Sequence, residues 1–244
     1  MIEKLLSNIR EFGFSDGLLY NLSRLLEMSK AGALHKYHFY AQPLCAKRRL
    51  PERRGKNIET RWLERGAPEL ADIPRPPMVI DERFIQGGRC LGAFIDNKLV
   101  GCLWYVLQRY REDEVRCDFD FSNEKDCIWD FDVYVDPGHR LGMVFLRLWD
   151  QADLELNERG YRWSLSRISA FNQHSVRSHE RLGAKEVGSA LFLTLGNWQW
   201  SHSSQSKGVR WSRKDDDRPQ LQIRLPANMR SDERNEVFES VHRA

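Results

Sequence analysis

One continuous stretch, residues 127–184, constrains the fold of this 244-residue chain more than any other part of its sequence. It begins with an alternating apolar run, turns at Pro137-Gly138 and continues as an amphipathic helix. A second strand over 163–170 and a second helix over 175–182 follow. The first backbone N–H groups of a helix have no partner and lie at its positive end. The sequence therefore predicts an anion-binding turn between the first strand and the first helix.

The rest of the sequence predicts a series of helices and strands around this stretch. Asp96-Asn97 separates two apolar runs and suits the tight turn of a β-hairpin. Helical spacing predicts helices over 1–12, 16–29, 58–64, 81–85, 141–159 and 232–242. Apolar or alternating runs predict strands over 34–44, 90–95, 98–105, 115–121, 128–135, 185–200, 209–213 and 221–225. This order suits a mixed sheet with helices packed on it.

Composition narrows the classes of protein that the chain can belong to. A formal net charge of +3 argues against a nucleic-acid-binding protein, and no window of about 20 apolar residues predicts a membrane span. The five cysteines lack CxxC spacing, which favours reduced thiols and a cytoplasmic protein. One cationic cluster is interpreted as a solvated loop; it comprises Lys47, Arg48, Arg49, Arg53, Arg54 and Lys56.

Alternation along the first strand of the stretch predicts two different faces. One face carries Trp129, Phe131, Val133 and Val135, and the other carries Ile128, Asp130, Asp132 and Tyr134. Two carboxylates on one face of a strand lie about 7 Å apart. In a secluded site, each would make the other a stronger base. We therefore expect Asp130 and Asp132 to share one site.

Two segments of the stretch resemble the acyl-CoA-binding region of the GNAT superfamily of acetyl-CoA-dependent N-acetyltransferases. The first is DVYVDPGHRLGM, residues 132–143, with His139 where the family prefers Arg or Gln and Val144 in place of a small residue. The second has the family's Asn-x-x-Ala-x-x-x-Tyr-x-x-Leu-Gly-Phe spacing, carried by Asn172, Ser175, His179, Leu182, Gly183 and Ala184. The resemblance extends over residues 90–200.

The resemblance implies an α+β, or mixed α/β, fold. Its centre is a GNAT-like mixed, mostly antiparallel sheet flanked by helices, with a helical N-terminal extension. We expect three parts: an extension and linker over 1–77, an acetyltransferase domain over 78–213, and a strand and helix tail over 214–244.

The resemblance also implies acetyl-CoA as co-substrate. No metal is expected, because the histidines show no ligand spacing with acids or cysteines. The pyrophosphate would lie over the amides of Arg140, Leu141, Gly142, Met143 and Val144, next to His139. Gly142 would allow the closest approach, and the β-branched Val144 would crowd it. The pantetheine arm would run beside Tyr134 and Val135 and contact Asn172 and Ser175, with Asn172 also able to cap the following helix.

Three residues are candidates for catalysis. Asp132 or Asp130 would accept the proton of the ammonium group, directly or through water. His179 lies where the family commonly has a tyrosine that protonates the thiolate of coenzyme A, and a histidine ordinarily titrates near pH ~6.5. The alternative for His179 is a surface residue on a short helix.

The resemblance implies transfer of an acetyl group from acetyl-CoA to a primary amine by direct attack in a ternary complex. Two alternatives are a longer acyl group, delivered by acyl-CoA or by an acyl carrier protein docked on the cationic cluster, and a non-catalytic acyl-CoA-binding module. The acceptor would be a small amine or an amino sugar, although the sequence does not distinguish these from a protein lysine. A homodimer is an open option. Six residues would either line the cleft that binds the acceptor or pack in the core: Trp104, Tyr105, Arg109, Tyr110, Trp198 and Trp200.

Overall fold

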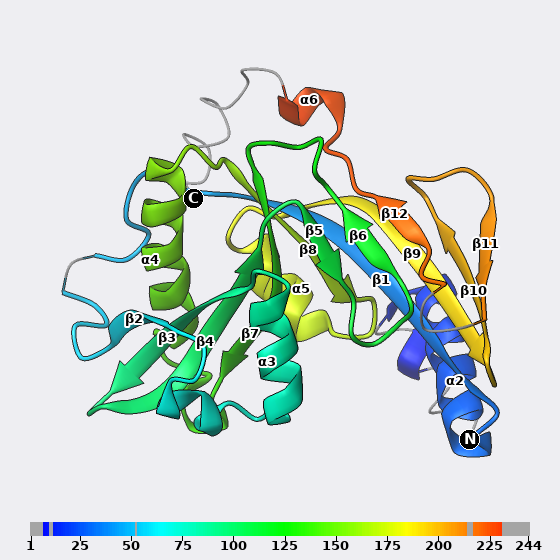
Figure 1. The fold of residues 1–244 in the computed structure, drawn as a ribbon, viewed down its shortest axis with the longest axis horizontal. Coiled ribbons are helices and arrows are strands. Elements are labelled where there is room, and N and C mark those ends of the chain that lie inside the picture. Colours follow the sequence, from blue (N-terminus) through cyan, green and yellow to red (C-terminus); the bar gives the residue numbers. More distant parts are fainter. Residues whose placement is uncertain (1–6, 10–11, 52, 214–216, 231–244) are drawn as a thin grey trace. The chain divides into compact units, whose positions relative to one another are not determined.

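The computed structural model describes residues 7–9, 12–51, 53–213 and 217–230. These divide into two compact units. The first unit comprises Met1–Gln42, Arg111–Asn123 and Ser166–Ala244, and the second comprises Pro43–Tyr110 and Glu124–Leu165. Each unit combines helices with strands, which confirms the mixed α/β class (Figure 1). The helix expected over 232–242, and much of that over 1–12, lie outside the described residues.

The strands of the second unit lie in the order β7-β4-β3-β2, and each neighbouring pair is antiparallel. Its elements are β2 (Glu59–Leu63), η1 (Pro68–Asp72), α3 (Pro77–Ile85), β3 (Arg89–Ile95), β4 (Lys98–Val106), β7 (Cys127–Val135), η2 (Pro137–His139) and α4 (Val144–Glu158). The helix expected over 58–64 is wrong, because this segment is β2. It pairs with β3 from Glu59 opposite Phe94 to Leu63 opposite Cys90, and this pairing overrides the local helical pattern.

The hairpin between β3 and β4 turns at Asp96-Asn97, as the sequence predicts. Ile95 pairs with Lys98, so the turn has two residues. Asp96 has φ 49° and Asn97 has φ 62°. A two-residue turn with positive φ at both positions matches the twist of antiparallel strands, and Asp and Asn tolerate this conformation best after glycine.

A bulge in β7 separates the two carboxylates that we expected on one face. Trp104 of β4 pairs with Asp132, but the next residue, Tyr105, pairs with Asp130, so Phe131 is an extra residue in β7. Paired residues share a face of the sheet, whereas Trp104 and Tyr105 are consecutive and point to opposite faces. Asp130 and Asp132 therefore lie on opposite faces, and the predicted common face is wrong.

Helices pack on both faces of the second unit's strands. The predicted apolar stripe of α4 is buried, at Val144, Leu148, Ala152 and Leu156. Its first turn lies directly on β4, because a Cβ added to Gly101 would lie 2.8 Å from both Val144 Cγ1 and the Tyr134 carbonyl oxygen. Helix α3 covers the other face, where the rings of Phe84 and Trp104 lie 4.9 Å apart. Gly101 thus allows α4 to begin just beyond the end of β7.

The first unit has the strand order β11-β10-β9-β1, also antiparallel. Its elements are α2 (Phe14–Ser29), β1 (Gly32–Pro43), β6 (Asp118–Asp120), α5 (Gln173–Glu180), β9 (Lys185–Leu195), β10 (Trp198–Ser203), β11 (Val209–Ser212), β12 (Gln220–Gln222) and α6 (Ala227–Arg230). β12 and β6 are parallel. β1, β5 (Arg109–Arg111) and β8 (Trp163–Ser169) each have residues in both units. The single strand expected over 185–200 is two strands that turn at Gly196.

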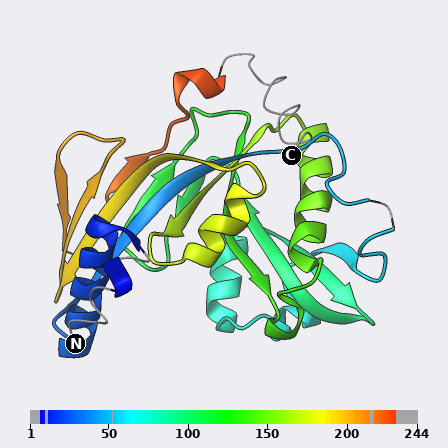
Figure 2. The same ribbon diagram turned by 180° about the vertical axis from the view of Figure 1, so that it is seen from behind.

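Two helices of the first unit lie on one side of β1 (Figure 2). Asp16 of α2 contacts Lys36 and His38, and His179 of α5 contacts Gln42. These three β1 residues are an even number of positions apart, so they share a face. The five cysteines are free and buried, and no described helix is long and apolar enough to cross a membrane.

Candidate active site

The turn between β7 and α4 is held by its own hydrogen bonds. Asp136 Oδ1 accepts from the Gly138 amide at 2.9 Å, and the Asp136 carbonyl accepts from the His139 amide at 2.8 Å. The His139 carbonyl accepts from the Gly142 amide at 3.0 Å. Arg140 Nε donates to the Val135 carbonyl at 3.2 Å. The turn is therefore ordered by its own hydrogen bonds, and the Gly142 amide already has an acceptor, the His139 carbonyl.

The N-terminus of α4 has no side-chain cap. Its cap residue, Met143, makes no side-chain cap hydrogen bond, and the Met143 carbonyl accepts from the Arg147 amide at 2.8 Å. The amides before Arg147 lie in the first turn, at the positive end of the helix. Leu141 and Gly142 are exposed beside them, and the Leu141 side chain has full exposure. This geometry suits a phosphate group.

Val144 does not crowd this turn, contrary to our expectation. Its side chain is 1% exposed and lies over Gly101 in the core. Gly142 has no positive φ, and a Cβ added there would meet only the His139 carbonyl oxygen, at 3.2 Å. Gly142 therefore keeps the space above the turn free of a side chain, and its backbone conformation does not require glycine. Tyr134 and Val135, expected beside the pantetheine arm, are half-buried at the end of β7.

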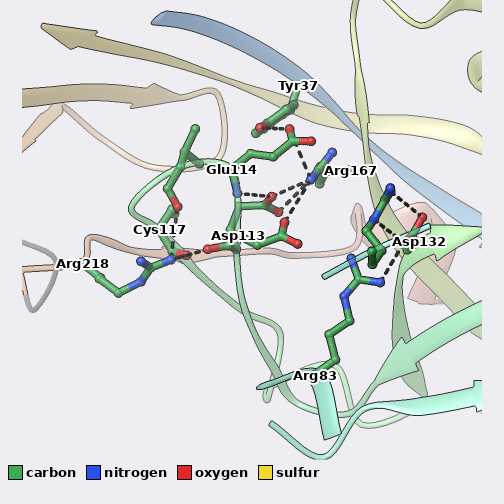
Figure 3. Close-up of polar contacts among 11 residues, drawn as sticks. Tyr37, Arg83, Asp113, Glu114, Cys117, Asp132, Arg167 and Arg218 are labelled. Carbon is green, nitrogen blue, oxygen red and sulfur yellow. Dashed lines mark hydrogen bonds and ion pairs between the residues drawn. The ribbon is translucent and has the colours of Figure 1, made fainter. Parts of the chain in front are cut away.

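Asp132 lies on the α3 face and is held by two arginines (Figure 3). Arg83 Nη1 lies 2.7 Å from Asp132 Oδ2, and Arg75 Nε lies 3.2 Å from the same oxygen. Arg75 Nη2 donates to Oδ1 at 3.3 Å. Arg83 is buried, and its guanidinium also lies 5.2 Å from the Phe131 ring, whereas the Arg75 side chain is 43% exposed. The ion pair of Asp132 with Arg83 is thus buried. The ion pair with Arg75 is partly exposed, so another cation can compete with Arg75 for Asp132.

Asp130 has a different environment on the α4 face. It is 3% exposed, and its Oδ2 accepts from Ser164 Oγ at 2.7 Å. Ser164 itself is fully buried in β8. The bulge at Phe131 is the reason that the two carboxylates have separate partners, so neither can act on the other as the sequence suggested.

His179 is a core residue, so the alternative of a surface position is wrong. It is 4% exposed, and its Nδ1 lies 3.1 Å from Gln42 Oε1. Burial lowers the pKa of His179 to about 4, so the imidazole is neutral at neutral pH. A carbonyl oxygen accepts, which places the proton on Nδ1 in this arrangement. Rotation of the Gln42 amide would exchange the two tautomers, and the buried Gln42 Nε2 has no hydrogen-bond partner.

Burial of His179 predicts a loss of stability in acid. The pKa is about 4 in the folded chain and about 6.5 when unfolded, so the unfolded chain binds the proton first as the pH falls. Stability is then lost from about pH 6.5 down to about pH 4, by about 3 kcal/mol at pH 4. We expect His179→Gln to remove this part of the pH dependence in urea unfolding at pH 7, 5 and 4. His174→Gln, at an exposed position of the same helix, should keep it. Equal slopes for wild type and His179→Gln would contradict the assignment.

Asn172 caps α5, as the sequence predicts. Its Oδ1 accepts from the Ser175 amide at 3.1 Å. The helix ends before Gly183, which has φ 88°, and the Ala184 amide donates to the His179 carbonyl at 3.0 Å. Capping at both ends explains why so short a helix forms.

Other residues that the sequence singled out lie elsewhere. Trp104, Tyr105 and Tyr110 are buried in the core rather than exposed in a cleft, whereas Trp198 is 49% exposed on β10. Arg49 of the cationic cluster is not solvated, because it forms an ion pair with the buried Asp153. Among the described residues, no three His, Cys, Asp or Glu side chains are grouped as metal ligands would be.

A buried ionic network in the first unit was missed by sequence reasoning (Figure 3). Arg167 Nε and Nη2 donate to the two carboxylate oxygens of Glu112 at 2.9 and 2.5 Å, and Tyr37 donates to Glu114 Oε2 at 2.7 Å. Burial raises the pKa of Glu112, while Arg167 opposes this shift. Arg218 donates to the carbonyls of Glu112, Val115 and Cys117. The one signal in the sequence was an arginine inside the apolar strand over 163–170.

Comparison with known proteins gives one strong match. A model of the Acetyltransferase (GNAT) family matches residues 57–184, just over half of the chain. Among curated proteins, no sequence matches significantly.

Several solved structures resemble the chain at low identity. An aminoglycoside acetyltransferase from an uncultured soil metagenomic sample, in complex with sisomicin, aligns with a TM-score of 0.37 and 10% identity over 52% of this chain and 87% of that one. A GNAT-family protein from Novosphingobium aromaticivorans aligns with a TM-score of 0.45 and 17% identity over 66% and 64%. An aminoglycoside N-acetyltransferase in complex with CoA aligns with a TM-score of 0.39 and 18% identity over 56% and 93%.

Proposed function

Because the chain belongs to the GNAT acetyltransferase family, we propose that it transfers an acetyl group from acetyl-CoA to a primary amine by direct attack in a ternary complex. One observation carries this proposal. The uncapped N-terminus of α4 follows β7 through a turn whose outer residues, Leu141 and Gly142, are exposed. A helix N-terminus of this kind binds the phosphates of nucleotide-like ligands.

We assign the pyrophosphate to the first turn of α4. The amides of this turn would donate to phosphate oxygens, and Gly142 would contribute the absence of a side chain rather than its own amide, which is bonded to His139. His139, Arg140 and Met143 border the same turn. We assign the pantetheine arm to Tyr134 and Val135 at the end of β7.

When bound, acetyl-CoA supplies a thioester whose C–S bond is replaced by a C–N bond to the amine. The acceptor nitrogen loses two protons in the reaction, and the second goes to solvent after the C–N bond has formed. Before attack, the protein must take one proton from the acceptor ammonium, because an amine with a pKa of about 10 is protonated at neutral pH. We propose Asp132 as the group that receives this proton, directly or through water. Its less tightly held oxygen, Oδ1, is bonded to the half-exposed Arg75 at 3.3 Å, and a cationic acceptor would displace that guanidinium.

Asp130 and His179 are given supporting roles. Asp130 is too enclosed to meet an acceptor, and we propose that its bond to Ser164 positions β7 within the second unit. His179 is equally enclosed, and we propose that its bond to Gln42, as a neutral imidazole, positions α5 within the first unit. The departing sulfur would then take its proton from solvent.

A thermal-shift titration with acetyl-CoA tests the proposal. A ligand that binds only the folded chain adds about 2.7 kcal/mol of stability at 100 times its Kd, so the unfolding midpoint should rise with concentration. Acetyl-CoA consumption should then appear with one or more members of a panel of amines and amino sugars. A midpoint that stays constant at millimolar acetyl-CoA would contradict the assignment of the site. A rise in midpoint without turnover on any amine would contradict the enzymatic part alone.

A further inference from the structure

A cationic turn lies beside the N-terminus of α4. It comprises Arg53, Arg54 and Lys56, which are all exposed. Within the described part of the chain, none of the three forms an ion pair with a carboxylate. Arg48 and Arg147, by contrast, both contact Asp150, at 3.5 and 3.3 Å. The positive charge of the turn is therefore not neutralised by a carboxylate of the described residues.

The turn lies against the N-terminal end of α4. Gly55 is its central residue, and a Cβ added there would lie 3.6 Å from the Cβ of Met143, the cap residue of α4. The preceding residues are anchored on α4, because Asp150 Oδ1 accepts from the Arg49 amide at 2.6 Å and from the Leu50 amide at 3.3 Å. The three cations flank Gly55 by one or two positions. Their flexible side chains can reach the space around the first turn of α4.

We propose that Arg53, Arg54 and Lys56 bind the 3′-phosphate of coenzyme A. This inference rests on the proposed function, which assigns the pyrophosphate to the first turn of α4. The 3′-phosphate is attached to the ribose at the far side of the pyrophosphate from the pantetheine arm, so it needs cations outside the helix terminus. A phosphate monoester carries between one and two negative charges near pH 7 and pairs well with several guanidinium and ammonium groups. The turn precedes the family match, which begins at residue 57, so this contact would belong to this chain rather than to the matched domain.

The test compares CoA with 3′-dephospho-CoA by calorimetry at constant ionic strength. Wild type should bind CoA about tenfold or more tightly than 3′-dephospho-CoA, since several exposed ion pairs act together. The triple variant Arg53→Ala/Arg54→Ala/Lys56→Ala should lose this preference and keep its affinity for 3′-dephospho-CoA within about twofold. A charge-matched control, Lys98→Ala/Lys125→Ala/Lys207→Ala, removes three exposed lysines from other segments and should keep the preference.

Retained affinity for 3′-dephospho-CoA also shows that the triple variant is folded. Equal affinity of wild type for the two ligands would overturn the inference while the proposed function stands. Equal weakening of both ligands in the triple variant would also overturn it, because that result indicates general electrostatic attraction. A triple variant that still prefers CoA over 3′-dephospho-CoA would also overturn the inference. If that variant in addition no longer accepts an acyl group from an acyl carrier protein, the cationic turn is a docking site for the carrier protein. Absence of binding of either ligand to wild type would overturn the proposed function itself.

Discussion

Gly142→Glu is expected to reduce acetyl-CoA affinity by two orders of magnitude or more. The substitution places a carboxylate at the exposed turn before α4, where the proposed site receives a negatively charged pyrophosphate. The fold should tolerate it. Gly142 has no positive φ, the position is exposed, and an added Cβ would meet only the His139 carbonyl oxygen, at 3.2 Å. The loss should therefore be one of binding rather than of folding.

The matched control for this variant is Gly142→Ala, which adds the Cβ without the charge. We expect it to change acetyl-CoA affinity by less than about tenfold, since a methyl group costs far less than an opposed charge. Calorimetry measures both affinities, and thermal unfolding without ligand shows whether each variant is folded. Equal affinity of Gly142→Glu and wild type would remove α4 from the cofactor site. An equal loss of affinity in both variants would show that the added side-chain volume, and not the negative charge, causes the effect.

Asp132→Asn is expected to lower kcat/KM for the amine by about 10²- to 10⁴-fold at neutral pH, the usual range for loss of a general base. Acetyl-CoA affinity should stay unchanged, because Asp132 lies on the α3 face and α4 on the other. The defect should shrink as the pH rises toward about 10, because a growing share of the acceptor is then already the neutral amine and needs no base before attack. Steady-state kinetics between pH 6 and 10 measure this change.

Two controls separate chemistry from stability in this experiment. Loss of the Asp132 charge removes one partner of a buried ion pair with Arg83, which can cost about 3–5 kcal/mol, so urea unfolding must accompany the kinetics. Arg75→Ala keeps the buried pair and removes the exposed competitor, and it should lower KM for a cationic amine. A rate defect of equal size at every pH would show that Asp132 is structural and not the proton acceptor.

Local patterns predicted much of the fold because each depends on neighbours in the sequence. Two residues that tolerate positive φ make the Asp96-Asn97 hairpin. The apolar positions of α4 recur every four residues and are buried together. Asn172 caps the helix that starts at the next residue. In each case the interaction lies within a few residues, so the sequence contains it directly.

The candidate site was less predictable, because its details depend on pairing across strands and on packing. The bulge at Phe131 arises from the register between β4 and β7, and one extra residue reverses the face of every residue beyond it. Val144 turns away from the phosphate turn because Gly101, more than forty residues earlier, leaves room for its side chain. The contact of the cationic turn with Met143 joins segments almost ninety residues apart. Patterns among neighbouring residues contain no information on contacts between segments so far apart in the sequence.

The sequence by itself determined the strand, turn and helix that can receive a phosphate, and the spacing from Asn172 to Ala184 that shows the family resemblance. Only the tertiary structure decided what the candidate side chains face. Asp132 meets two arginines, Asp130 meets Ser164, and His179 is enclosed and neutral. The physical reason is that helix formation and capping are set by residues a turn apart, whereas the charge and proton affinity of a side chain are set by burial and by partners from distant segments.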